Sequence, residues 1–223
     1  MVECAMAKDY IGYIIITAAL GLCLPASGQA QTPEEILIGA IQDGGKVIYL
    51  RHATTNPNEV DSGRLGDRAG QRNLTDAGRE LARQLGPAFR SLRIPVDEIF
   101  ASPVYRARDT AELAFGADRV TVTMDLVADD YASTAPTRSG KSERQSMLDA
   151  TARLLRTVPP VPGTNRILVG HRIPLEMVMG TKFPDTVLPE GAMAIFLPGG
   201  TAPYLLGILT ADRLLKSAAL RRW

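Results

Sequence analysis

The stretch VIYLRHATTN, residues 47–56, decides the fold. It starts with four consecutive apolar residues and becomes polar abruptly at Arg51 and His52. An unbroken apolar run of this length predicts a strand covered on both faces, as in the middle of a parallel sheet. The chain has one other histidine, and it closes a similar phrase, RILVGH at residues 166–171. We expect the two phrases to meet in space.

The composition indicates an ordinary soluble globular protein of one domain. Of the 223 residues, 45% are hydrophobic and 22% are charged, and a chain of this length can bury one substantial core. The 25 basic residues nearly balance the 24 acidic ones, so the net charge is +1. Such a balance offers no broad positive field, and we therefore expect no nucleic-acid partner.

Predicted strands and helices alternate along the chain. The predicted strands are residues 46–53, 97–103, 119–126, 166–171, 191–198 and 202–209. Helices are predicted within residues 31–45, from Thr75 through Leu92, at residues 105–116 and from Ser142 to Val158. This alternation predicts an α/β fold, a single-domain three-layer sandwich with a mostly parallel six-stranded sheet and helices on both faces.

Candidate functional residues stand at the predicted ends of three strands. They are Arg51 with His52, Ser102 with Pro103, and Gly170 with His171. Ligands of such sheets bind beyond the carboxyl ends of the strands, so these pairs should lie on one rim. Arg106 follows Pro103 by three residues and is expected to join them.

Two imidazoles and at least two guanidinium groups on one rim would form a dense positive pocket. Each side chain has an ordinary explanation by itself, because a lone histidine is commonly structural and an arginine commonly exposed. The sequence shows no obvious acidic cluster to neutralise the group, which implies an anionic ligand. Guanidinium is planar, permanently charged and matched to phosphate oxygens, so we expect the ligand to carry a phosphoryl group.

Four phrases in this order carry a family resemblance: LRHATT, NLTDAGRELARQLG, ASPVYRARDTA and LVGHRIPLE. Together they resemble the histidine phosphatase superfamily, which has the phosphoglycerate-mutase-like fold. The resemblance extends from Lys46 to the end of the sixth predicted strand. Within the superfamily the chain looks most like small exported bacterial members, related to phosphohistidine and lipopolysaccharide-phosphate phosphatases.

The resemblance implies a cofactor-independent phosphatase, a phosphomonoesterase of the histidine acid phosphatase type. Its substrate would be a small-molecule or glycan-linked phosphoester. His52 would attack phosphorus to give a phosphohistidine, which water then hydrolyses. Arg51, Arg106 and His171 would hold the phosphoryl oxygens.

The general acid that protonates the leaving group is harder to assign. The mutase-like branch places a glutamate after the third strand, where this chain offers Asp129 and Asp130. The phytase-like branch has an aspartate directly after the second histidine, where this chain has Arg172. Glu190, just before the fifth predicted strand, is the preferred candidate because some exported relatives carry an acid there. The shortest relatives need no dedicated acid, so that alternative stays open.

Two other functions fit the same residues. One is a non-catalytic phosphate-binding module that has kept the pocket and lost turnover, and the other is a structural envelope protein whose arginines bind acidic glycan. The loops at residues 54–72 and 127–142 are expected to form a lid over the pocket. They contain few aromatic residues, which argues against stacking of a nucleobase. Neither the physiological substrate nor the oligomeric state is predicted.

Residues 1–30 are predicted to be a signal peptide, and residues 31–223 the histidine-phosphatase-like domain. The apolar run at residues 11–24 is shorter than the about 20 residues of a membrane-spanning helix, and small residues precede Gln31 as in a cleavage site. The protein would then be periplasmic or secreted, without a stable membrane span. Acidic residues before the apolar run weaken this interpretation, and translation from Met6 would remove one of them. The alternative is a buried N-terminal helix.

Neither a metal nor a cofactor is expected. Both cysteines, Cys4 and Cys23, lie in the predicted signal peptide, so the mature chain would have no disulfide and no thiolate metal site. Both histidines are already assigned to the phosphoryl group. Asp129 and Asp130 alone cannot complete a cation site.

Overall fold

The computed structural model describes residues 31–136, 138 and 140–221. The predicted signal peptide, with both cysteines and the alternative start at Met6, lies outside the described residues. The described residues belong to one unit, which begins at Gln31. None of the helices in this part of the chain is long and apolar enough to cross a membrane.

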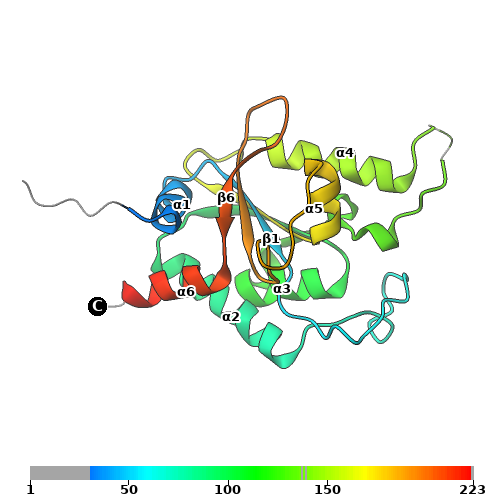
Figure 1. Cartoon of the computed structure of the whole chain (residues 1–223), viewed down its shortest axis with the longest axis horizontal. Helices are drawn as coiled ribbons and strands as arrows, with labels where there is room; N and C mark the ends of the chain where they lie inside the picture. Colours follow the sequence, from blue (N-terminus) through cyan, green and yellow to red (C-terminus); the bar gives the residue numbers. More distant parts are fainter. Residues whose placement is uncertain (1–30, 137, 139, 222–223) are drawn as a thin grey trace, which may run out of the picture. The chain divides into compact units, whose positions relative to one another are not determined.

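Six strands form one sheet in the order β3-β2-β4-β1-β5-β6 (Figure 1). The strands are β1 (Val47–Arg51), β2 (Val96–Ala101), β3 (Val120–Val122), β4 (Asn165–Gly170), β5 (Met193–Leu197) and β6 (Tyr204–Leu209). Neighbouring strands from β3 to β1 are parallel, whereas β5 is antiparallel to both β1 and β6. The predicted six-stranded, mostly parallel sheet is confirmed.

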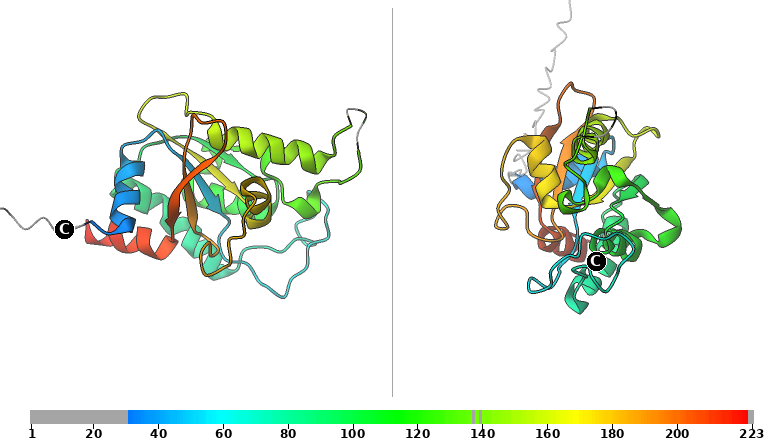
Figure 2. Two further views of the ribbon diagram at one scale, coloured as in Figure 1. Left: turned by 45° about the horizontal axis from the view of Figure 1, so that its top comes forward. Right: turned by 90° about the vertical axis from the view of Figure 1, so that its right-hand side faces the viewer.

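Helices cover both faces of the sheet (Figures 1 and 2). They are α1 (Pro33–Gln42), α2 (Asp76–Ser91), α3 (Tyr105–Phe115), α4 (Glu143–Arg156), α5 (Arg172–Met179) and α6 (Ala211–Leu220). The helices α1, α2, α3 and α6 share one apolar cluster with Ile48 and Leu50 of β1, and α4 and α5 share the opposite cluster with Val47 and Tyr49. Successive side chains of a strand point to opposite faces, so one strand serves both cores. The three-layer sandwich is confirmed.

The strand β1 lies in the middle of the sheet, and all five of its residues are buried. It pairs in parallel with β4 in a register that places Arg51 opposite Gly170. The backbone N–H of His52 donates to the carbonyl oxygen of Gly170 at 3.1 Å, which continues the pairing past the end of β1. The two similar phrases are therefore neighbouring strands, and their histidines follow at the same edge.

Local capping residues set the start of two helices near this edge. The Thr75 hydroxyl accepts the backbone N–H of Gly78 at the start of α2, and the Ser142 hydroxyl accepts that of Gln145 at the start of α4. A Cβ atom at Gly78 would lie 2.0 Å from the carbonyl oxygen of Thr54. Glycine is therefore required for α2 to pack directly against the residues that follow β1.

The third predicted strand and the helix predicted to start at Ser142 end earlier in the structure than expected. The strand predicted at residues 119–126 is reduced to the edge strand β3, because a 3-10 turn at Met124–Leu126 follows and buries Leu126 in the core. The helix predicted to reach Val158 ends at Arg156, and Val158 is 58% exposed. The two prolines directly after Val158 cannot continue a helix.

Neither α5 nor α6 is predicted from the sequence. Pro174 lies in the first turn of α5, where a backbone N–H has no partner within the helix, so proline is tolerated there. Thr210 caps α6, which buries Leu214 in the core. Because α5 begins directly after His171, it contributes to fixing the backbone of the second histidine.

Candidate active site

The carboxyl ends of β1, β2 and β4 bring the predicted residues to one pocket. Arg51 ends β1, His171 follows β4, and Arg106 lies in the first turn of α3, shortly after β2. Together with His52 they line a pocket of about 230 Å³, and all four side chains are buried. The predicted gathering of these four residues on one rim is confirmed.

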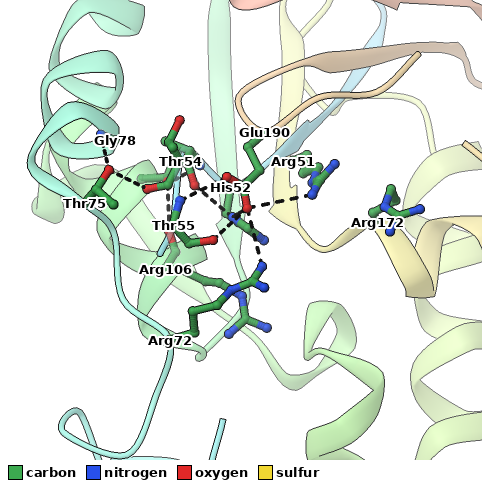
Figure 3. Close-up of polar contacts among 12 residues, drawn as sticks. Arg51, His52, Thr54, Thr55, Arg72, Thr75, Gly78, Arg106, Arg172 and Glu190 are labelled. Atoms are coloured by element: carbon green, nitrogen blue, oxygen red, sulfur yellow. Dashed lines mark hydrogen bonds and ion pairs between the residues drawn. The ribbon is translucent and has the colours of Figure 1, made fainter. Parts of the chain in front are cut away.

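His52 presents one ring nitrogen to the protein and the other to the pocket (Figure 3). Its Nδ1 lies 2.9 Å from the carbonyl oxygen of Ala53. A carbonyl only accepts hydrogen bonds, so Nδ1 carries the proton and Nε2 keeps its lone pair. Burial, and next the positive charge of Arg106, lower the pKa of His52 well below its ordinary value. The ring is therefore neutral at neutral pH, as a nucleophile must be.

His171 lies beside His52, with the ring centroids 5.4 Å apart and the ring planes at 54°. Its Nε2 is 2.9 Å from the Ser102 hydroxyl oxygen. Burial, and next the charge of Arg106, also lower the pKa of His171 well below its ordinary value. The two rings are close enough to contact one phosphoryl group.

Four arginines line the pocket, and in the described part of the chain each has an Nε–H that makes no hydrogen bond. The Nε atoms of Arg51, Arg72, Arg106 and Arg172 are buried without a hydrogen-bond partner among the described residues, as is Nδ1 of His171. Buried polar groups are normally hydrogen-bonded, and leaving one unpaired costs about 1–3 kcal/mol. Five such nitrogens around one pocket indicate that it binds an anion rich in acceptor oxygens.

The prediction that no acidic cluster neutralises the arginines is wrong. The NH1 atom of Arg106 donates to both carboxylate oxygens of Asp61, at 2.8 and 3.0 Å. The NH1 atom of Arg51 donates to Asp185, and Glu190 lies 3.8 Å from its NH2 atom. The carboxylates come from separate loops, so no local sequence pattern groups them. They hydrogen-bond terminal nitrogens of the guanidinium groups and not the Nε atoms, although Asp185 also lies 3.7 Å from Nε of Arg172.

The two loops predicted to form a lid meet at Asp61. Asp61 belongs to the first loop, residues 54–72, and its side chain is only 12% exposed. It accepts the hydroxyl hydrogen of Tyr131, from the second loop, at 2.9 Å, and the backbone N–H of Arg72 at 2.8 Å. Asp61 therefore connects both loops to Arg106 at the pocket wall.

Glu190, the preferred general acid, lies on the Nδ1 side of His52, at 3.9 Å (Figure 3). Its two carboxylate oxygens accept the backbone N–H and the hydroxyl hydrogen of Thr55, at 3.0 and 2.7 Å. It is not among the residues that line the pocket, whereas Asp129 and Asp130 are. The structure thus places Glu190 next to the first histidine but away from its free nitrogen.

Asp130 lines the pocket beside Asp129. Burial raises its pKa, although the nearby charge of Arg106 acts in the opposite direction. A carboxyl group with a raised pKa keeps its proton closer to neutral pH.

Within the described part of the chain, no group of three histidine, cysteine, aspartate or glutamate side chains is placed to hold a metal ion.

The sequence model of the histidine phosphatase superfamily (branch 1) matches residues 47–130. The matched residues include β1, the Arg51–His52 pair that follows its apolar run, and Arg106 at the start of α3. This part of the chain carries the sequence pattern of the histidine phosphatase superfamily.

Solved structures share the histidine phosphatase fold. The protein histidine phosphatase SixA complexed with tungstate has a TM-score of 0.50 at 14% identity, over 76% of this chain and 99% of that chain. A putative phosphohistidine phosphatase SixA from Agrobacterium tumefaciens has a TM-score of 0.43 at 21% identity, over 74% and 98% of the two chains. Phosphoserine phosphatase from Entamoeba histolytica, in complex with 3-phosphoglyceric acid, has a TM-score of 0.48 at 14% identity, over 76% and 98%. No curated protein matches the chain.

The pocket also contains residues that are not predicted from the sequence. Arg72 and Arg172 line it together with Asp61. The positions of the two arginines in the sequence could have indicated that they lie near the pocket. Arg72 shortly precedes Thr75, the N-cap of α2, and Arg172 directly follows His171. Asp61 lies in the middle of a polar loop, and nothing in the sequence distinguishes it from its neighbours.

Proposed function

We propose that this chain is a phosphomonoesterase that works through a phosphohistidine on His52. The observation that carries the proposal is the free Nε2 of His52 in a pocket lined by residues with five unpaired nitrogens. Attack of the Nε2 lone pair on phosphorus forms an N–P bond and breaks the P–O bond to the leaving group. Water then attacks the same phosphorus, which releases phosphate and restores His52.

The arginines supply the electrostatic part of this mechanism. Phosphoryl transfer depends mainly on positioning and on stabilising the negative charge spread over the oxygens. Arg51 and Arg106 are each held at NH1 by a carboxylate, so their Nε donors need little reorganisation when the phosphoryl group arrives. His171, which follows the neighbouring parallel strand β4, completes the group of donors.

The leaving oxygen takes its proton from Asp130 in this proposal rather than from Glu190. Asp130 lines the pocket and its pKa is raised by burial, so it can hold a proton for the leaving group. Glu190 already accepts two hydrogen bonds from Thr55 and lies on the far side of the His52 ring. Its place supports a role in holding His52 and the loop after β1.

The choice of general acid predicts a dependence on the leaving group. Asp130→Asn should lower kcat on an alkyl phosphate about 100-fold, because an alkoxide needs a proton to leave. It should change kcat on p-nitrophenyl phosphate much less, because nitrophenolate leaves without one. The neighbouring Asp129→Asn variant is the comparison. If Asp129→Asn shows the leaving-group dependence and Asp130→Asn does not, the acid is Asp129.

The substrate is a small or glycan-linked phosphoester presented outside the cytoplasm. A polar pocket of about 230 Å³ supports a compact group around the phosphate rather than a nucleotide. A solved structure with the same fold, that of the protein histidine phosphatase SixA, contains tungstate, an oxyanion with the tetrahedral shape of phosphate. The predicted signal peptide at residues 1–30 supports export.

Hydrolysis of p-nitrophenyl phosphate by the purified full chain, with a chelator present, tests the proposal. Wild-type protein should turn over and form an acid-labile, base-stable phosphoenzyme, and His52→Ala should do neither. A wild-type rate no higher than that of His52→Ala would overturn the enzymatic function. Retained binding of inorganic phosphate in that case would instead support the non-catalytic phosphate-binding module.

A further inference from the structure

Ser102, at the end of β2, has a fully buried side chain that contacts the second histidine. Its hydroxyl oxygen accepts the backbone N–H of Val104 at 3.2 Å and lies 2.9 Å from Nε2 of His171. These are the only hydrogen bonds of this hydroxyl among the described residues. The contact joins two of the three strand ends that form the pocket.

The hydrogen of the Ser102 hydroxyl has one possible acceptor among the described residues. Val104 can only donate, so the Ser102 hydrogen can be satisfied only by the lone pair of a ring nitrogen. If Nε2 of His171 carried a proton, the hydroxyl oxygen would accept two hydrogen bonds and its own hydrogen would be buried without an acceptor. A buried unpaired donor is disfavoured, so Nε2 accepts from Ser102 and the proton of the neutral ring sits on Nδ1.

Tyr49 holds the backbone of His171, whereas Ser102 contacts its imidazole ring. The Tyr49 hydroxyl donates to the carbonyl oxygen of His171 at 2.9 Å and accepts its backbone N–H at 3.0 Å. A Cβ atom at Gly170 would lie 2.3 Å from the same Tyr49 oxygen, so the strand end is closely packed. Ring orientation and the position of the ring proton remain for the side-chain contact to decide.

We propose that Ser102 is a positioning residue that holds His171 in the Nδ1-protonated tautomer, so that Nδ1–H donates to the phosphoryl group. Nδ1 is buried without a partner among the described residues, and His171 lines the pocket. The lowered pKa of His171 is consistent with a neutral ring, in which the tautomer decides which nitrogen donates. The catalytic part rests on the proposed function, whereas the tautomer does not.

Nitrogen NMR of histidine tests the tautomer directly. The chain contains only two histidines, so nitrogen-15-labelled histidine gives two sets of ring signals, and His52→Ala identifies those of His171. In wild-type protein at neutral pH, Nδ1 of His171 should be protonated and Nε2 should be unprotonated. Inorganic phosphate should shift the Nδ1 signal.

Variants of Ser102 separate positioning from general packing. Ser102→Ala should let His171 populate the other tautomer and lower kcat on p-nitrophenyl phosphate about tenfold, the cost of one lost neutral hydrogen bond. Ser102→Thr keeps the hydroxyl and should restore both properties. Thr151→Val is the matched control, because it removes a buried hydroxyl that donates to the carbonyl oxygen of Asp125, away from the pocket. It should change neither the tautomer nor kcat.

Three results would overturn the proposal: an Nε2-protonated His171 in wild-type protein, an unchanged tautomer in Ser102→Ala, or an equal shift in Thr151→Val. Circular dichroism establishes that each variant is folded, and the tautomer of the wild-type protein decides the matter if Ser102→Thr does not fold. Wild-type protein with the predicted tautomer and a phosphate-dependent Nδ1 shift, but without hydrolysis, would contradict the proposed function and leave the role of Ser102 standing.

Discussion

Arg106 is held at one nitrogen of its guanidinium group and unpaired at another. Asp61 accepts two hydrogen bonds from NH1, while Nε is buried without a partner in the described part of the chain. Because guanidinium is planar and rigid, fixing NH1 also fixes the direction of the Nε–H bond. A lysine at the same position would supply the charge without this geometry.

Replacing Arg106 by lysine should therefore lower kcat/KM on p-nitrophenyl phosphate about 100-fold. The expected loss of about 3 kcal/mol is that of one removed transition-state donor. Arg108→Lys is the matched control, because Arg108 lies on the same helix and pairs with Glu112 at its exposed face. That exposed pair contributes little, so Arg108→Lys should keep the wild-type rate. Equal rates for the two variants would argue against a directional role for Arg106.

At the scale of elements, the start of α2 packs directly against the segment after β1, and we call this contact, formed by Thr54, Thr75 and Gly78, the joint (Figure 3). The carbonyl oxygen of Thr54 accepts both the backbone N–H and the hydroxyl hydrogen of Thr75, at 3.0 and 3.3 Å. Gly78, one turn into α2, is close enough to Thr54 that no side chain fits between them. The joint holds the segment after His52 in place and anchors both ends of the first loop.

Gly78→Ala should separate α2 from this segment. The added methyl group would meet the carbonyl oxygen of Thr54, and overpacking of this kind costs about 1–3 kcal/mol in the free energy of unfolding. Gly39→Ala in α1 is the control, because a Cβ atom there meets nothing within 4 Å. That change should stabilise the protein by about 0.5–1 kcal/mol, since alanine favours a helix interior over glycine. Urea denaturation measures both, and destabilisation by both variants would refute the packing argument.

At the scale of the whole molecule, two buried neutral histidines link folding to pH. Burial lowers the pKa of both His52 and His171 in the folded protein, whereas in the unfolded chain they titrate near the ordinary value of about 6.5. Below that pH the unfolded chain binds more protons than the folded protein. The stability contributed by the neutral rings is therefore fully present above about pH 6.5 and is lost as the pH falls.

We expect the free energy of unfolding to decrease between about pH 6.5 and pH 5. The double variant His52→Gln with His171→Gln should show a flatter dependence over this interval, whatever its absolute stability. The Asp185 carboxyl, whose pKa is lowered by its hydrogen bond from Arg51, contributes only in more acidic solution. Thermal unfolding at a series of pH values measures the slope. A double variant with the wild-type slope would show that other groups cause the dependence.

The sequence by itself determined the centre of the sheet and four residues of the pocket. Apolar runs are local features, and those of β1 and β4 predict two buried strands without reference to any tertiary contact. Parallel strands end at the same edge, so polar residues directly after them had to gather. Arg51, His52 and His171 are therefore expected to lie together, with Arg106 beside them.

Only the tertiary structure decided which carboxylates accompany the arginines and which nitrogen of each histidine is free. Asp61 and Asp185 reach Arg106 and Arg51 from loops, whose paths follow no periodic pattern in the sequence. In His52 the carbonyl of Ala53 engages Nδ1 and leaves Nε2 free, whereas in His171 the hydroxyl of Ser102 engages Nε2 and leaves Nδ1 free. Protonation and hydrogen bonding are set by burial and by neighbours in space, and these exist only once distant parts of the chain have packed together.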